Sequence, residues 1–112
     1  MLVEIKGRRA LFACLVADVS EEEPFRASFP DRAPIAIFKA DGAFFALDDT
    51  CSHGQASLCE GFVEKGTVEC PYHAALFDLR TGAALTMPAT EPVTAYAVEI
   101  DDGKLYVVVG PT

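Results

Sequence analysis

Four residues between Cys51 and His73 have the types and the spacing of a metal site. The motif Cys51-Ser52-His53 is followed, after sixteen residues, by Cys70-Pro71-Tyr72-His73. Thiolate and imidazole are ligands of zinc, copper or iron, whereas carboxylate-rich sites suit magnesium or calcium. The chain has only four cysteines and two histidines, and both histidines stand close to a cysteine. The sequence therefore predicts that Cys51, His53, Cys70 and His73 bind a metal, whose identity the ligands alone leave open.

The size and charge of the chain limit what else it could be. Its 112 residues, 51% of them hydrophobic, are enough for a single domain with one modest core. The formal net charge is −8, and the acidic residues are spread along the chain. This charge argues against nucleic-acid binding, which needs a basic patch. It favours basic partner surfaces, although a generic acidic surface explains it equally well.

The N-terminal apolar run from Ala10 to Ala17 follows two arginines and has only eight residues. It is very short for an export signal, and Asp18 ends it without a convincing small-residue cleavage site. We therefore expect a strand, buried on both faces or at the seam of a sandwich. No apolar stretch approaches the length of a membrane span, so we expect no membrane partner. Without an export signal, a reducing cytoplasm is the expected location.

Short alternating segments and turn signals predict an all-β domain, a sandwich or a barrel. No segment of helical length has a period of 3.6 residues, and residues 57–60 could hold one turn of helix at most. Hairpin turns are expected at Asp41-Gly42, Lys65-Gly66 and Asp101-Asp102-Gly103, because these residues tolerate positive φ. The expected strands cover residues 2–6, 10–17, 25–29, 35–39, 44–47, a hairpin over 62–69, and 75–78, 93–100 and 104–109.

The metal-site residues and their surroundings resemble the Rieske [2Fe–2S] motif, in particular that of the ferredoxins of bacterial aromatic-ring dioxygenases. The resemblance implies a Rieske fold, with an antiparallel β-sandwich base and a small cluster-binding subdomain of two ligand loops at about residues 48–90 of a single domain, 1–112. It implies one [2Fe–2S] cluster, with Cys51 and Cys70 on one iron and His53 and His73 on the other. The residues that carry it are Cys51-Ser52-His53-Gly54-Gln55-Ala56-Ser57-Leu58, Glu60-Gly61, Val68-Glu69-Cys70-Pro71-Tyr72-His73, Phe77-Asp78 and Arg80-Thr81-Gly82.

Histidine ligation sets the redox character of such a cluster. Two ferric ions, two sulfides and two thiolates carry no net charge when both imidazoles are neutral, whereas a cluster held by four thiolates is already a dianion. Adding an electron to the neutral cluster is therefore easier, and its reduction potential is higher.

Two departures from the Rieske proteins of respiratory and photosynthetic bc-type complexes place the chain in a subclass. Those proteins carry an additional cysteine in each ligand loop, joined as a disulfide, where this chain has Ala56 and Tyr72. The hydroxyl donor that follows their second histidine is also missing, because Ala74 and Ala75 come next. Fewer hydrogen bonds to the sulfurs stabilise the reduced cluster less, so we expect a low potential within the Rieske range.

The leading hypothesis is an electron carrier without catalytic residues. By resemblance, its partners are an NAD(P)H-dependent flavoprotein reductase and a terminal aromatic-ring oxygenase, with Asp48, Asp49 and Glu60 as candidates for steering their encounters by charge. The alternatives are a small Rieske-like subunit of an assimilatory nitrite reductase and a zinc-stabilised binding module, because zinc also accepts two cysteines and two histidines. Cys14 and Cys59 are expected to be free thiols; the alternatives for Cys59 are a third thiolate ligand or a disulfide with Cys14.

The colour and the potential of the purified protein test the identity of the metal. We expect a red-brown protein that bleaches with dithionite and has a reduction potential of about −150 mV, at the low end for histidine-ligated clusters. Visible spectroscopy and protein-film voltammetry measure both properties. A colourless protein would indicate zinc, and a potential well above zero would contradict the proposed subclass.

Overall fold

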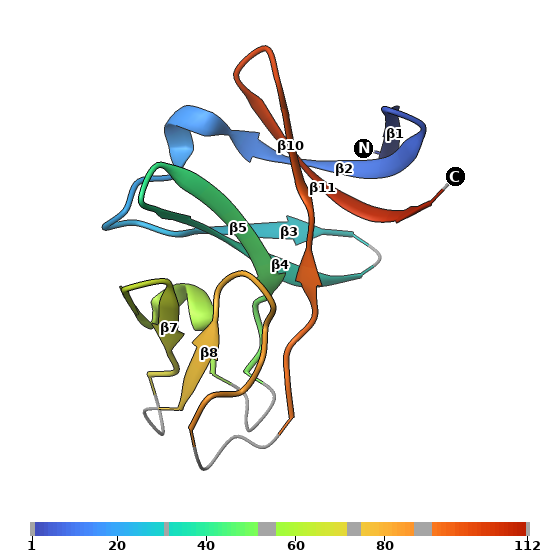
Figure 1. Ribbon diagram of the computed structural model, residues 1–112. Helices are drawn as coiled ribbons and strands as arrows, with labels where there is room; N and C mark the ends of the chain where they lie inside the picture. The colour runs from blue at the N-terminus through green and yellow to red at the C-terminus, as the bar shows by residue number, and fades with distance from the viewer. Residues whose placement is uncertain (1, 31, 52–55, 72–74, 87–90, 112) are drawn as a thin grey trace.

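The computed structural model describes residues 2–30, 32–51, 56–71, 75–86 and 91–111. These residues form antiparallel β-strands, joined by tight turns and two 3₁₀ turns at Val16–Asp18 and Leu58–Glu60 (Figure 1). The molecule measures about 37 × 25 × 21 Å along its principal axes. In the described part of the chain, no helix is both long and apolar enough to cross a bilayer.

The first sheet has the strand order β1-β2-β11-β10. It consists of β1 (Leu2–Ile5), β2 (Arg8–Leu15), β11 (Lys104–Pro111) and β10 (Val98–Asp101), all paired antiparallel. The second strand of the chain, β2, and the last, β11, therefore lie side by side at the centre of the sheet (Figure 1).

The second sheet has the order β3-β4-β5-β9. It consists of β3 (Phe25–Phe29), β4 (Arg32–Ala40), β5 (Ala43–Asp48) and the two-residue β9 (Ala95–Tyr96). The strands again pair antiparallel, with Ile35 of β4 opposite Asp48 of β5. The end of β5 therefore delivers the chain directly to the first predicted ligand.

The two four-stranded sheets pack face to face around one apolar core. Both sheets contribute to it, so the predicted antiparallel sandwich is confirmed. Burial of such side chains is the main stabilising term of the base. The fully or nearly buried members of this core are Cys14, Val19, Ala27, Ile35, Ile37, Ala46, Leu105 and Val107.

A third, smaller sheet lies on the other face of β4 and β5. It has the order β6-β7-β8 and consists of β6 (Phe62–Glu64), β7 (Thr67–Glu69) and β8 (Leu76–Asp78). Figure 1 shows β7 and β8 on the side of β4 and β5 that faces away from β2. The second core lies between these layers, and its members are Ala36, Phe38, Ala40, Leu47, Cys51, Ala56, Leu58, Val68, Cys70, Ala75, Phe77, Leu79 and Val93.

Strand β4 is buried on both of its faces. Ile35 and Ile37 belong to the base core, whereas Ala36 and Phe38, pointing the other way, belong to the core beneath the small sheet. Two-sided burial was one expectation for the run from Ala10 to Ala17, and there it is wrong: Phe12 is 37% and Leu15 45% exposed. The reason is that β2 packs against the second sheet with only one face.

The expected strand over residues 93–100 is two strands. β9 pairs with β5 in the second sheet, whereas β10 pairs with β11 in the first. The chain crosses between the sheets at Ala97, whose carbonyl accepts a hydrogen bond from the N–H of Val108 at 2.9 Å. Apolar alternation continues through the crossing, so the sequence pattern contains no sign of it.

The tight turns follow one rule of backbone geometry. At Asp41-Gly42, Lys65-Gly66 and Asp102-Gly103, both residues have positive φ, near 52° for the first and 75–78° for the glycine. This is the geometry of type I′ hairpin turns, and it confirms the predicted hairpins. A fourth such turn, Lys6-Gly7, joins β1 to β2 and was not predicted. The expected turn of helix within residues 57–60 is confirmed as the 3₁₀ turn Leu58–Glu60.

Alanine substitutions at Gly42 and Gly82 distinguish the stability cost of a positive φ from the cost of steric overlap. Gly42 has φ +78° in open space, whereas a Cβ on Gly82, also at φ +78°, would overlap the carbonyl oxygen of Val93. Gly42→Ala should therefore lower the free energy of unfolding by about 1–2 kcal/mol, the cost of a left-handed alanine. Gly82→Ala should lower it by clearly more, as measured by denaturant unfolding. Equal losses would contradict the close packing of the chain at Val93.

Candidate metal centre

The two predicted ligand motifs lie in loops that are built alike. Cys51 follows β5, and its N–H donates to the carbonyl of Ala56 at 2.9 Å; Cys70 follows β7, and its N–H donates to the carbonyl of Ala75 at 2.7 Å. In each case four residues separate the bonded pair. Each cysteine therefore stands at the base of a closed loop of the same length.

Neighbouring strand pairing holds the base of each loop. In the first loop, Thr50 forms a β-bridge with Ser57, and the N–H of Leu58 donates to the carbonyl of Asp49 at 2.7 Å. In the second, Glu69 of β7 pairs with Leu76 of β8. Fixed backbone at both bases is what a preorganised ligand set requires.

Both cysteine residues are buried in the same apolar core. Cys51 is 2% and Cys70 1% exposed, both belong to the core beneath the small sheet, and neither forms a disulfide. Two cysteines that lie in one buried core and come from two loops fit a metal centre with thiolate ligands on one side. The other two predicted ligands, His53 and His73, lie outside the described residues, as do Tyr72 and Ala74.

A buried carboxylate two residues before Cys51 fastens the first loop. Asp49 is 1% exposed and accepts hydrogen bonds from the Ser57 hydroxyl at 2.7–2.8 Å and from the Cys59 N–H at 3.0 Å. It also forms an ion pair with Arg26 of β3, with Nε and Oδ2 3.2 Å apart. A buried charge is tolerated only when paired and hydrogen-bonded in this way.

This environment corrects one expectation from the sequence. Asp49 was expected to help steer partners by its charge, but it is buried and neutralised by Arg26. Glu60 is exposed and remains a candidate for that role. The structural role of Asp49 could not be inferred from the sequence, because Ser57 and Arg26 become its partners only when the chain folds.

The neighbouring residue Asp48 belongs to a second polar group at the end of β5. The Tyr96 hydroxyl donates to Asp48 Oδ1 at 2.6 Å and accepts from an Arg32 guanidinium N–H at 3.1 Å. Burial, followed by the hydrogen bond and the charge of Asp48, raises the pKa of Tyr96 to about 12. Tyr96 therefore stays protonated near neutral pH and keeps donating to Asp48. This bond ties β9 to the strand that leads into the first loop.

The remaining cysteines are free, as expected. Cys14 is buried in the base core, and burial, together with the charge of Asp18, raises the pKa of its thiol to about 11. Cys59 is half-buried, and its thiol lies 3.5 Å from the carbonyl oxygen of Pro24. Burial and the Asp49 carboxylate raise the pKa of Cys59 as well. Raised pKa values disfavour the thiolate form, so neither residue has the character of a reactive thiol.

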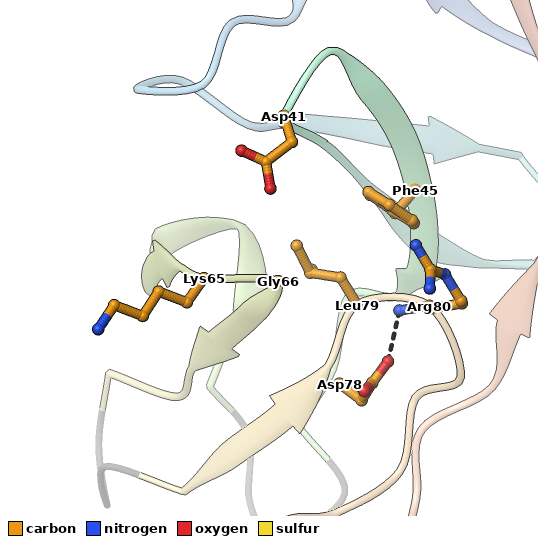
Figure 2. A pocket seen from close by; sticks show the side chains of 7 residues that line it. All are labelled: Asp41, Phe45, Lys65, Gly66, Asp78, Leu79 and Arg80. Carbon is orange, nitrogen blue, oxygen red and sulfur yellow. Dashed lines mark hydrogen bonds between the residues drawn. The ribbon is translucent and has the colours of Figure 1, made fainter.

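A separate cleft between two hairpin turns does not have the donors of a metal site. It has a volume of about 500 Å³, and its described lining contains neither cysteine nor histidine (Figure 2). Asp78 is already engaged, accepting from the backbone N–H of Arg80 at 2.7 Å and of Thr81 at 3.0 Å. The Arg80 guanidinium lies 5.9 Å from the centre of the Phe45 ring. The lining residues are Asp41, Phe45, Lys65, Gly66, Asp78, Leu79 and Arg80.

Comparison with known proteins identifies the kind of domain. The family model described as "Rieske [2Fe-2S] domain" matches residues 9–97. Among curated proteins, the chain is 50% identical over 99 residues to the 3-phenylpropionate/cinnamic acid dioxygenase ferredoxin subunit of Escherichia coli K12. That alignment covers 87% of this chain and 91% of the relative.

Solved structures give the same result for the fold. The Sphingomonas yanoikuyae B1 ferredoxin is 35% identical with a TM-score of 0.82, over 91% of this chain and 98% of that one. A chain in the complex of reduced oxygenase and oxidized ferredoxin in carbazole 1,9a-dioxygenase is 33% identical with a TM-score of 0.83, over 92% and 95%. Both likenesses extend over nearly the whole chain.

Removal of the Asp49 carboxylate tests whether it fastens the first loop. Asp49→Ala should lower the free energy of unfolding by ~2–3 kcal/mol, because charge-assisted hydrogen bonds are lost and the Cys59 N–H is left unpaired. The visible absorbance of the protein should also decay faster in the presence of an iron chelator. Glu21→Ala, on an exposed loop, is the control and should change neither quantity. An unchanged decay rate in Asp49→Ala would show that the loop holds without this carboxylate.

Proposed function

Because the chain belongs to the Rieske [2Fe–2S] domain family, we propose that it carries single electrons from an NAD(P)H-dependent flavoprotein ferredoxin reductase to the Rieske centre of a terminal aromatic-ring dioxygenase. It is an electron-transfer component of such a system and not itself a catalyst. The observation that carries the proposal is the 50% identity to a dioxygenase ferredoxin subunit, found in a chain whose two similarly closed loops each begin at a buried cysteine.

The cofactor is one Rieske [2Fe–2S] cluster. When bound, the cluster supplies a centre that takes up and releases one electron at a time. We assign Cys51 and Cys70 as ligands of one iron and His53 and His73 as ligands of the other. The buried position of both cysteines supports the first half of this assignment, and the spacing of the motif supports the second.

The fold positions the two cysteine ligands by backbone hydrogen bonds and buries them away from water. Both cysteine loops are closed by backbone hydrogen bonds, and Asp49 fastens the first of them. A fixed ligand set needs little rearrangement when the charge changes, which is what rapid electron transfer requires. We propose that residues 1–112 act as a single domain in which residues 48–90 form the cluster-binding subdomain.

The same proposal includes the location of the protein and its partners. None of the four cysteines forms a disulfide, which suits a reducing cytoplasm, where an NAD(P)H-linked reductase also works. The partners are a reductase and a terminal oxygenase, with no nucleic acid and no membrane. Among the described residues, no feature favours the nitrite reductase subunit or the zinc module over the electron carrier.

Reconstitution tests the function. Purified chain should support oxidation of 3-phenylpropionate when it is mixed with NADH and with the flavoprotein reductase and terminal oxygenase of the E. coli 3-phenylpropionate/cinnamic acid dioxygenase system. Turnover should be proportional to added chain at low concentration. Cys70→Ser should abolish turnover and remove the visible spectrum, because it removes a proposed iron ligand. Cys59→Ser, the matched control, should leave both unchanged.

Three other experimental outcomes would contradict parts of this proposal. Turnover that does not depend on the chain would contradict the carrier function. Constitutive co-purification with a large sirohaem-containing subunit would instead indicate the nitrite reductase alternative. A Cys59→Ser variant without a visible spectrum would show that the ligand assignment is wrong.

A further inference from the structure

The small sheet has one face in the core and one face on the surface. The pairing of its three strands places Val63, Val68 and Phe77 in one row across the sheet, and this row points into the core. Because side chains alternate along strands, the flanking rows point outward. These outward rows are Phe62–Glu69–Leu76 and Glu64–Thr67–Asp78.

The outward face carries large apolar side chains with little cover. Phe62 is 70% exposed, the highest value among the large hydrophobic residues of the described chain. Leu85, 49% exposed, extends the same row, because its N–H donates to the carbonyl of Leu76 at 2.8 Å. Exposed aromatic and aliphatic side chains that line up on one surface are typical of a protein interface.

Acidic hollows flank Phe62 on both sides. One, of about 340 Å³, is lined by Phe62 and Leu76 with Glu64, Glu69, Thr67 and Lys65. The other, of about 420 Å³, is lined by Phe62, Val63, Pro24 and Gly61 with Glu21 and Glu22. The described linings thus contain four glutamates and one cation, Lys65. The charge complementary to this surface is positive.

The face adjoins the second cysteine loop. Glu69 and Leu76 are paired across β7 and β8, and the next residues of each strand, Cys70 and Ala75, close the loop by their hydrogen bond. A protein seated on Phe62 and Leu76 therefore sits beside the loop that carries two of the proposed ligands, Cys70 and His73. This is a suitable position for electron transfer.

We propose that the surface formed by Phe62, Leu76 and Leu85 with Glu21, Glu22, Glu64 and Glu69 is the docking face for the terminal oxygenase. This inference rests on the proposed function. The oxygenase would place lysine or arginine side chains in the two hollows and an apolar recess over Phe62. A similar ferredoxin has been captured in complex with the oxygenase of a dioxygenase system.

Phe62 and the surrounding glutamates have different proposed roles in docking. Phe62 is the anchor, because a rigid aromatic side chain at the centre of an interface usually carries much of the binding energy. The glutamates around it act mainly on the rate of encounter and its dependence on salt. Truncating Phe62 should therefore change affinity, whereas reversing a glutamate should change salt dependence.

The apolar part is tested with four serine variants in the reconstituted 3-phenylpropionate system. Phe62→Ser should raise the KM of the oxygenase for reduced carrier about tenfold, and Leu85→Ser should raise it severalfold. Phe12→Ser and Leu2→Ser are matched controls, since these residues are 37% and 55% exposed on the first sheet. The controls should leave KM unchanged. The reduction potential and Tm of Phe62→Ser should equal those of the wild type, because most of its side chain is exposed.

The charged part is tested with Glu64→Lys against Asp101→Lys, which reverses an exposed carboxylate on β10. Glu64→Lys should slow reduction of the oxygenase at low ionic strength severalfold and flatten its dependence on salt. Asp101→Lys should change both quantities much less.

Reduction of each variant by the NADH-linked reductase, followed by bleaching, separates the two partners. Three results would each overturn the docking face and leave the carrier function intact. These are an unchanged KM in Phe62→Ser, an equal change of KM in the controls, and a change confined to the reductase step. If the wild-type chain supports no turnover, the proposed function itself fails, and the docking face fails with it.

Discussion

The geometry of the first cysteine loop depends on a buried negative charge. Asp49 is 1% exposed, and its carboxylate is tolerated only because Ser57, Cys59 and Arg26 satisfy it. These partners come from the 3₁₀ turn region and from β3, so one side chain joins the loop to the base. Displacement of Asp49 from Ser57, Cys59 and Arg26 would leave that carboxylate without partners. Cys51, two residues further on, is therefore held in place by an electrostatic requirement as well as by packing.

The second cysteine loop is held differently and reaches the same core. It is the end of the β7–β8 hairpin, and its inward row of side chains packs on β4 and β5. β4 makes this possible because its successive residues belong alternately to the base core and to the core beneath the small sheet. The base sandwich thus serves as a support, while the two loops, closed by equivalent hydrogen bonds, each place a cysteine in the same core.

Most local features of this fold could be predicted from the sequence, although the turn at Lys6-Gly7 was missed, and features that depend on distant contacts could not. The turns Asp41-Gly42 and Lys65-Gly66 and the ligand motifs have their signal within a few residues, so they were predicted. The partners of Asp49 lie on other elements, and the crossing at Ala97 interrupts no apolar pattern. The exposure of Phe62 also depends on which face of the hairpin meets β4, and strand alternation alone does not specify that face.

We propose that two loops hold one [2Fe–2S] cluster with thiolates on one iron and imidazoles on the other. Pulsed electron paramagnetic resonance on the dithionite-reduced protein tests this ligand set, because directly bound nitrogen couples strongly to the unpaired spin. We expect two strongly coupled nitrogens, one from His53 and one from His73, with one signal lost in each single substitution to serine. A reduced protein without strongly coupled nitrogen would contradict it.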